Sequence, residues 1–265
     1  MLTLRIITAA VLIAATLISV YWPSSWLMPL SFGVVWTAGA WEWGRLAGWP
    51  RVGVWIYTLA GVLLALASGG LFDQAGAQQI AWIVTSWWAV AFGAVLLYPW
   101  RIPIAFVAGA GLLALLPSWF LLVYLHLAGP AGPNAVLILL VIVWAADVGA
   151  YFVGRTFGRV KLAPAVSPGK TWEGVVGGLA AATGAASIAA VLLGQSVASW
   201  VAVGLATALM SIVGDLTVSM FKRRAGKKDS SRLLPGHGGV LDRIDSLTAA
   251  VPVYFLATHL AGLSI

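Results

Sequence analysis

Apolar residues form long stretches along the chain, each close to the ~20 residues that a helix needs to cross a bilayer. Proline, glycine or charged residues separate one stretch from the next. The expected spans are 4–21, 26–44, 52–68, 80–98, 103–126, 134–153, 173–194, 198–221 and 245–263. Pro117 lies inside the fifth and indicates either one kinked helix or two shorter pieces. The pattern predicts an all-α polytopic membrane protein with about nine transmembrane helices.

Composition supports this fold class. Hydrophobic residues make up 61% of the 265 residues and charged residues only 9%, whereas soluble domains carry about 25% charged residues. This balance excludes a soluble globular protein, a disordered chain, collagen and a coiled coil. The chain has no cysteine, which removes disulfides, thiolate metal sites and thiol nucleophiles. No nucleic-acid partner is expected.

The charges predict an orientation. With the N-terminus in the cytoplasm, all fifteen Lys and Arg residues lie on the cytoplasmic side or at that membrane edge, and the opposite loops carry only Asp73. This distribution follows the positive-inside rule, and it favours a single crossing for 103–126. Residues 1–130 are then an N-terminal region of about five spans. Residues 131–265 are expected to form a C-terminal region with cytoplasmic loops 154–173 and 221–241, which the residues described next predict to be catalytic.

Acidic residues gather in the C-terminal half, where six of the eight follow residue 146. At ~1.5 Å per residue, Asp147 and Asp215 would lie roughly 10 Å below the cytoplasmic membrane surface. Asp242 and Asp245 are three residues apart and would share a helix face. A carboxylate inside a membrane span is costly and usually faces a partner or a water-filled cavity. Four carboxylates at one depth therefore predict a Mg²⁺ site, although they could instead form structural ion pairs with nearby cations.

Two basic cytoplasmic loops frame these carboxylates. Loop 154–173 contains Lys170, and loop 221–241 begins with Lys222 and Arg223 and contains a glycine pair, Gly238 and Gly239. Lys and Arg neutralise phosphate oxygens, and glycines let backbone N–H groups approach an anion closely. Simple attraction to anionic membrane lipid would explain the positive charge but not the interposed acidic residues. The combination is typical of phosphoryl or nucleotidyl transfer. In the second span, Glu42 is expected to pair with Arg45 or Arg51.

At this point the residues resemble a known family. The stretch 219–245 is similar to the signature of the phosphatidate cytidylyltransferases, also called CDP-diacylglycerol synthases. The matching positions are Ser219, Lys222, Arg223, Lys228, Asp229, Ser231, Leu234, Pro235, His237, Gly238, Gly239, Asp242, Arg243 and Asp245. Segments 147–158 and 167–174 resemble the same family. Gly169 departs from it, because many members carry Lys or Asn there.

The resemblance implies that CTP and phosphatidate react to give CDP-diacylglycerol and pyrophosphate, with Mg²⁺ required. It also implies a bacterial-type inner-membrane enzyme, often a homodimer, whose active site faces the cytoplasm. Asp147, Asp215, Asp242 and Asp245 are the expected metal ligands, with Asp147 completing the site or ordering a second cation. The expected catalytic residues are Lys222, Arg223, Lys228, Asp229 and Arg243. The expected substrate-binding residues are Ser167, Lys170, Thr171, Ser219, His237, Gly238 and Gly239.

Two alternatives stay open. A CTP-dependent lipid-alcohol kinase has a similar membrane-embedded, metal-dependent design, but it would release CDP instead of pyrophosphate. A membrane transporter also places polar residues inside a helix bundle. A transporter of this kind would show interrupted spans in two corresponding halves, and the sequence has no such repeat.

Overall fold

The computed structural model describes residues 2–68 and 73–263, and these residues form nine helices and one small sheet. The elements in chain order are α1 (Leu2–Tyr21), α2 (Leu27–Ala47), α3 (Arg51–Ala67), α4 (Gln74–Leu96), α5 (Ile104–Leu127), α6 (Gly132–Phe157), β1 (Lys161–Ala163), β2 (Ser167–Thr171), α7 (Trp172–Leu193), α8 (Val197–Arg224) and α9 (Leu241–Leu260). Each helix falls on one of the predicted apolar stretches, with ends that differ by a few residues. The described chain is therefore mostly helical, as predicted.

Length and hydropathy distinguish several of the helices. Within the described residues, α4, α5, α6, α7 and α8 are long and apolar enough to cross a membrane. The apolar parts of α1 and α3 are shorter. The fifth stretch is one helix, because α5 continues through Pro117. These properties are those of a multi-pass membrane protein.

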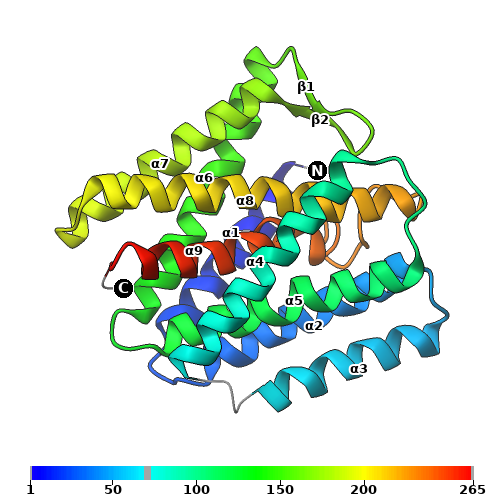
Figure 1. Ribbon diagram of the computed structural model, residues 1–265, viewed down its shortest axis with the longest axis horizontal. Helices are drawn as coiled ribbons and strands as arrows, with labels where there is room; N and C mark the ends of the chain where they lie inside the picture. The colour runs from blue at the N-terminus through cyan, green and yellow to red at the C-terminus, as the bar shows by residue number, and fades with distance from the viewer. Residues whose placement is uncertain (1, 69–72, 264–265) are drawn as a thin grey trace.

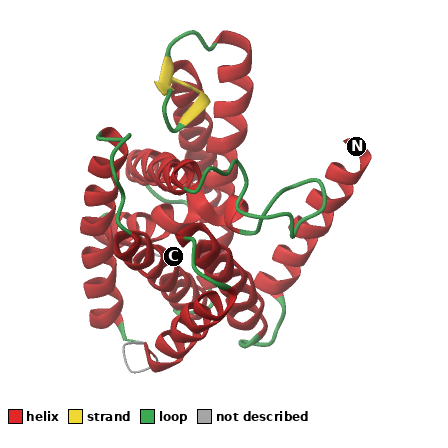
Figure 2. Cartoon of the chain, turned by 90° about the vertical axis from the view of Figure 1, so that its right-hand side faces the viewer, coloured by secondary structure: helices red, strands yellow, loops and turns green. Residues whose placement is uncertain are grey.

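The connections between helices alternate between two ends of the bundle. Those after α2, α4, α6 and α8 lie toward the right in Figure 1, whereas those after α1, α5 and α7 lie toward the left. The upper parts of α6 and α7 rise above the other helices in both views, and the two strands lie beside their tip (Figure 2). The basic loops 154–173 and 221–241 consequently share one end of the molecule.

The first of these loops contains a β-hairpin that the sequence did not predict. α6 extends to Phe157, and β1 pairs antiparallel with β2, with Lys161 opposite Thr171 and Ala163 opposite Ser167. The strands have three and five residues, too short to show an alternating apolar pattern. The Thr171 side chain then caps α7 by accepting from the Gly174 backbone N–H at 3.1 Å. The hairpin thus fixes where α7 begins.

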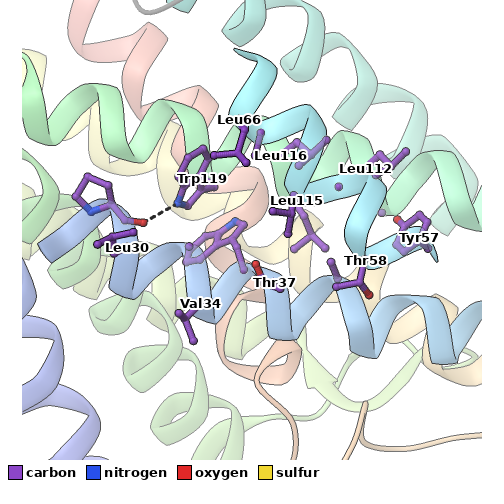
Figure 3. A pocket seen from close by; sticks show the side chains of 18 residues that line it. Leu30, Val34, Thr37, Tyr57, Thr58, Leu66, Leu112, Leu115, Leu116 and Trp119 are labelled. Atoms are coloured by element: carbon purple, nitrogen blue, oxygen red, sulfur yellow. Dashed lines mark hydrogen bonds between the residues drawn. The ribbon is translucent and has the colours of Figure 1, made fainter. Parts of the chain in front are cut away.

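An apolar cavity of about 340 Å³ lies between α2, α3 and α5. Figure 3 shows Val34, Leu112 and Leu115 among the side chains that wall it, with Trp119 donating to the Pro29 carbonyl at 3.2 Å. None of its lining residues is charged. The chemistry that the sequence predicts therefore belongs elsewhere in the bundle.

Close approach of small residues joins α6 to α7, the pair of elements with the most extensive contact. Gly177 of α7 lies against Val153 of α6, and Gly149 of α6 lies against Gly177 and Ala181. In membranes such small residues let helix backbones approach each other. Further along α7, near its end, the apolar side chain of Leu192 is 80% exposed.

This packing predicts a difference between two alanine substitutions in α7. Gly177→Ala places a methyl group against the Val153 side chain and should destabilise the protein by about 1–3 kcal/mol, the usual cost of overpacking. Gly184→Ala is the matched control, because its methyl group meets no described atom within 4 Å. Thermal unfolding in detergent measures both. Equal melting temperatures would contradict tight packing at Gly177.

Candidate active site

Nine of the sixteen predicted site residues line one cavity of about 630 Å³ at the basic end of the bundle. α6, α8 and α9 form its walls together with the hairpin and the first turn of α7. Its charged lining consists of five carboxylates, Asp147, Asp215, Asp229, Asp242 and Asp245, and four cations, Arg155, Lys170, Lys222 and Arg243. We call it the carboxylate cavity. All four predicted metal ligands line it, so the three helices do converge.

Two lysines pair with two of the carboxylates. Lys170 Nζ, at the end of β2, lies 2.5 Å from Asp215 Oδ2, and both side chains are about one quarter exposed. Ser219, one helical turn after Asp215, donates its hydroxyl to Asp215 Oδ1 at 3.1 Å. Asp215 therefore links α8 to the hairpin, and Ser219 orients it.

The second pair joins α8 to α9 in a more buried place. Lys222 Nζ lies 2.8 Å from Asp242 Oδ1, and the two side chains are only 10% and 6% exposed. Asp242 Oδ2 accepts hydrogen bonds from the backbone N–H groups of Ser230 and Gly239, each at 3.0 Å. Both oxygens of Asp242 are thus occupied by protein donors. This residue fixes the loop before α9 to the end of α8.

The other two predicted metal ligands, Asp147 and Asp245, face the same cavity without such a partner. Within the described residues, neither has a Lys or Arg nitrogen within 4.0 Å. The described chain contains no group of three or more carboxylate or imidazole side chains gathered closely enough to hold a metal ion. The donor chemistry of Asp147, Asp215 and Asp245 nevertheless suits Mg²⁺, which prefers carboxylate oxygens. Asp242 suits it less well, because its oxygens are held by a buried lysine and by loop backbone donors, whereas the Asp215 side chain, although paired with Lys170, is about one quarter exposed.

A second, smaller cavity of about 380 Å³ adjoins the first and is lined by the loop after α8 and the first turn of α9. Its lining consists of Lys228, Asp229, Gly236, His237, Gly238 and Arg243. We call it the loop cavity. Asp229 and Arg243 line both cavities, so the two spaces meet at these side chains. The described lining has two fixed positive charges and one negative charge, which favours an anion.

Some predicted residues support the site from outside the cavities. Arg223 donates to the Val166 carbonyl at 3.0 Å and to the Lys227 carbonyl at 3.3 Å, which ties the hairpin turn to the end of α8. Thr171 caps α7, although it also lines the carboxylate cavity. Ser167 begins β2 and lines neither cavity. Gly239 packs against the side chains of Ser230 and Glu42.

Two residues near the site received no catalytic role from the sequence. Arg155, within a segment that resembles the family, lines the carboxylate cavity and donates to the Tyr151 hydroxyl at 2.6 Å. The predicted pairing of Glu42 in α2 with Arg45 or Arg51 is wrong. Glu42 is completely buried and accepts hydrogen bonds from the loop before α9 and from the start of that helix. Its partners lie almost 200 residues away in sequence, so they could not be predicted from the cations that are nearest to Glu42 in sequence.

The arrangement supports chemistry on phosphates. Lys and Arg side chains can neutralise phosphate oxygens, carboxylates can bind a divalent cation, and the cavity lies at an end of the helix bundle. Among the described residues, Cys is absent and the cavity linings offer no paired Ser and His of a nucleophilic site. These features define a membrane enzyme that acts on phosphorylated substrates.

Sequence comparison identifies the family. Residues 3–261 match the model of the cytidylyltransferase family. Phosphatidate cytidylyltransferase of Pseudomonas aeruginosa is 46% identical over 99% of this chain and 98% of its own length. The enzymes of the same name from Haemophilus influenzae and Brucella melitensis are 40% and 38% identical over 96% and 80% of this chain, covering 97% and 73% of their own lengths. The chain belongs to the cytidylyltransferase family.

The contacts of Asp242 predict a large effect on stability. Asp242→Ala leaves the buried Lys222 cation without its partner, and loss of one member of a buried pair costs about 3–5 kcal/mol. Trypsin should then cut faster after Lys227, Lys228 and Arg232, because the loop loses its anchor. Asp229→Ala is the control in the same loop, since Asp229 is exposed. Equal cleavage and unfolding of the two variants would show that Asp242 does not hold the loop.

Proposed function

We propose that this chain transfers the cytidylyl group of CTP to phosphatidate, forming CDP-diacylglycerol and pyrophosphate. The main support for this proposal is a single cavity lined by the carboxylates Asp147, Asp215 and Asp245 and by the cations Lys170 and Lys222. The family match over residues 3–261 and the named relatives support the same reaction. An oxygen of the phosphatidate phosphate attacks the α-phosphorus of CTP. The bond from that phosphorus to the oxygen bridging to the β-phosphorus breaks, and pyrophosphate leaves.

The protein supplies positioning and charge. Lys170 and Lys222, which differ in exposure, neutralise phosphate oxygens as negative charge moves toward the leaving group. Asp215 and Asp242 orient these two ammonium groups in the free enzyme. Because the phosphatidate phosphate is already anionic near neutral pH, the reaction needs no protein nucleophile. His237 is accordingly given no role as a general base.

We assign the metal to fewer residues than the sequence suggested. Asp147, Asp215 and Asp245 would hold Mg²⁺, and Asp242 is reserved for the loop. When bound, Mg²⁺ supplies charge neutralisation of the CTP phosphates. The lining of the carboxylate cavity supports a need for added positive charge, since its five carboxylates exceed its four cations by one while both substrates are anions.

The two cavities divide the substrates between them. The carboxylate cavity takes the lipid phosphate and the α-phosphate, and the loop cavity takes the β- and γ-phosphates that leave as pyrophosphate. The positive lining of the loop cavity favours this division, and Arg243, shared by both cavities, lies where the bond to the leaving group breaks. Lys228 and His237 would contact the diphosphate alone.

The membrane arrangement belongs to the same proposal. All nine helices cross the membrane, the N-terminus is cytoplasmic, and the active site faces the cytoplasm, where CTP is found. The alternation of helix connections (Figure 1) and the positive-inside charge pattern support this orientation. The bacterial source of the relatives supports an inner-membrane location. Direct contact with membrane lipid and a homodimer complete the proposal, the latter on the family resemblance alone.

The reaction predicts two products in equal amounts. Purified protein with CTP, phosphatidate and Mg²⁺ should release pyrophosphate and form CDP-diacylglycerol at one rate, and EDTA should stop both. Asp245→Asn should abolish turnover without affecting expression, because it removes a buried carboxylate charge from the cavity. Asp73→Asn is the control, since asparagine caps a helix about as well as aspartate and Asp73 caps α4.

Two results of this assay would contradict the proposed reaction, and a third would contradict only the metal assignment. Release of CDP with phosphorylation of a lipid alcohol would indicate the kinase alternative. Absence of both products from folded, lipid-supplied protein would favour transport. Retention of most activity by Asp245→Asn at saturating Mg²⁺ would remove Asp245 from the metal site while leaving the reaction intact.

The division between cavities predicts a selective effect at Lys228. Lys228→Gln should weaken product inhibition by pyrophosphate and raise the KM for CTP by about tenfold or more, because a hydrogen bond to a charged group contributes about 1.5–3 kcal/mol. The KM for phosphatidate should stay unchanged. Arg232→Gln is the control in the same loop, since Arg232 is exposed and lines neither cavity. An increase in the KM for phosphatidate alone would indicate that the loop cavity binds the lipid phosphate and not the β- and γ-phosphates of CTP.

A further inference from the structure

Glu42 is a buried carboxylate that the proposed mechanism does not use. It lies in α2, is 0% exposed, and has no Lys or Arg nitrogen within 4.0 Å among the described residues. Burying an unpaired charge is expensive, so a compensating set of hydrogen bonds is required. The structure provides that set from a single distant segment, residues 230–241.

Four donors saturate the two oxygens of Glu42. Oε2 accepts from Ser230 Oγ at 2.8 Å and from the Leu241 backbone N–H at 2.6 Å. Oε1 accepts from Ser231 Oγ and from the Val240 backbone N–H at 3.0 Å. A carboxylate has about four acceptor sites, so Glu42 has no vacancy for substrate. Its role must be exerted through the residues that it holds.

The backbone donors show which part of the site depends on Glu42. Val240 and Leu241 are the N-cap and first residue of α9, and the N-terminus of a helix carries a partial positive charge that favours an anion. α9 carries Asp242 in its first turn and Asp245 one turn after Leu241. Glu42 therefore fixes the start of the helix that brings both carboxylates to the cavity.

Ser230 connects Glu42 to the cavity by a second route. Its hydroxyl lies 2.8 Å from Glu42 Oε2 and 3.0 Å from Asp242 Oδ2, so its single hydrogen is shared between two carboxylates. Asp242 in turn accepts from Lys222. The side chains thus form a continuous chain from α2 through the loop to the cavity lysine.

We propose that Glu42 is a positioning residue for cytidylyl transfer, setting the start of α9 and, through Ser230 and Asp242, the place of the Lys222 ammonium group. This inference rests on the proposed function. Through Glu42, the N-terminal region would help to position groups that act in the reaction, although it contacts no substrate. The ligand contacts remain those of the two cavities.

Glu42→Gln tests this role while preserving size. The glutamine amide would present N–H groups to donors that now face an oxygen, so the start of α9 must shift. A displacement of about 1 Å at a reacting group can cost about 10²-fold in rate. We expect kcat per folded molecule to fall by about that factor, with the KM values for CTP and phosphatidate little changed.

Ser118→Ala is the matched control for general damage to the bundle. Ser118 of α5 is also 0% exposed and accepts a hydrogen bond from Trp36 of α2 at 2.8 Å, but it touches neither cavity. It should lose thermal stability yet keep its kcat per folded molecule. Glu42→Gln with a kcat equal to that of Ser118→Ala would overturn the proposal.

Ser231→Ala removes a hydrogen bond to Glu42 from the loop side, and it is the test variant if Glu42→Gln does not fold. It should lower kcat, and the double variant should be no slower than Glu42→Gln, because changes at one shared contact are not additive. A wild-type kcat for Ser231→Ala, or additive effects, would contradict the proposal. Hydrogen exchange at residues 240–245 should rise in either variant. That measurement needs no turnover, so it tests Glu42 even if the cytidylyl transfer itself were absent.

Discussion

The site is organised by the cost of placing carboxylates among apolar helices. A buried ionised group must be compensated by an opposite charge or by hydrogen bonds, and this chain uses both solutions. Asp215 and Asp242 are neutralised by Lys170 and Lys222. Glu42 is compensated by hydroxyl and backbone donors alone. The helices meet where these partners are found, so the same contacts that allow the charges to be buried also assemble the cavity.

This constraint joins the two regions of the chain. α2 packs against α3 and α5 and touches α9 only along part of its length, yet Glu42 in α2 fixes the start of α9. Arg224 at the end of α8 likewise donates to the Ile102 carbonyl before α5 at 2.9 Å. Such contacts explain why a site whose ligands come from the C-terminal half requires N-terminal helices of defined position.

The sequence was sufficient where a signal was local. Apolar stretches located the helices, since a bilayer-spanning helix needs a long run of apolar residues, and carboxylates within those stretches located the cavity. The hairpin was missed because β1 and β2 are too short for a periodic pattern. Helix spacing could not show that Lys222 and loop amides occupy both oxygens of Asp242, and its role as a metal ligand stays a prediction. The partners of Glu42 were missed because they are distant in sequence.

The two lysine–aspartate pairs differ in a way that matters for binding anions. Lys222 and Asp242 are almost enclosed, and Asp242 is further held by two backbone donors. If Lys222 left Asp242 to bind another anion, the buried carboxylate would lose its compensating charge, so this pair keeps its geometry. Lys170 and Asp215 are about one quarter exposed, and water can solvate each partner as they separate. An arriving phosphate therefore competes more readily for Lys170, while Lys222 offers its ammonium group from a fixed place. A nearly enclosed cation and a more exposed, exchangeable one allow substrates to enter without dismantling the site.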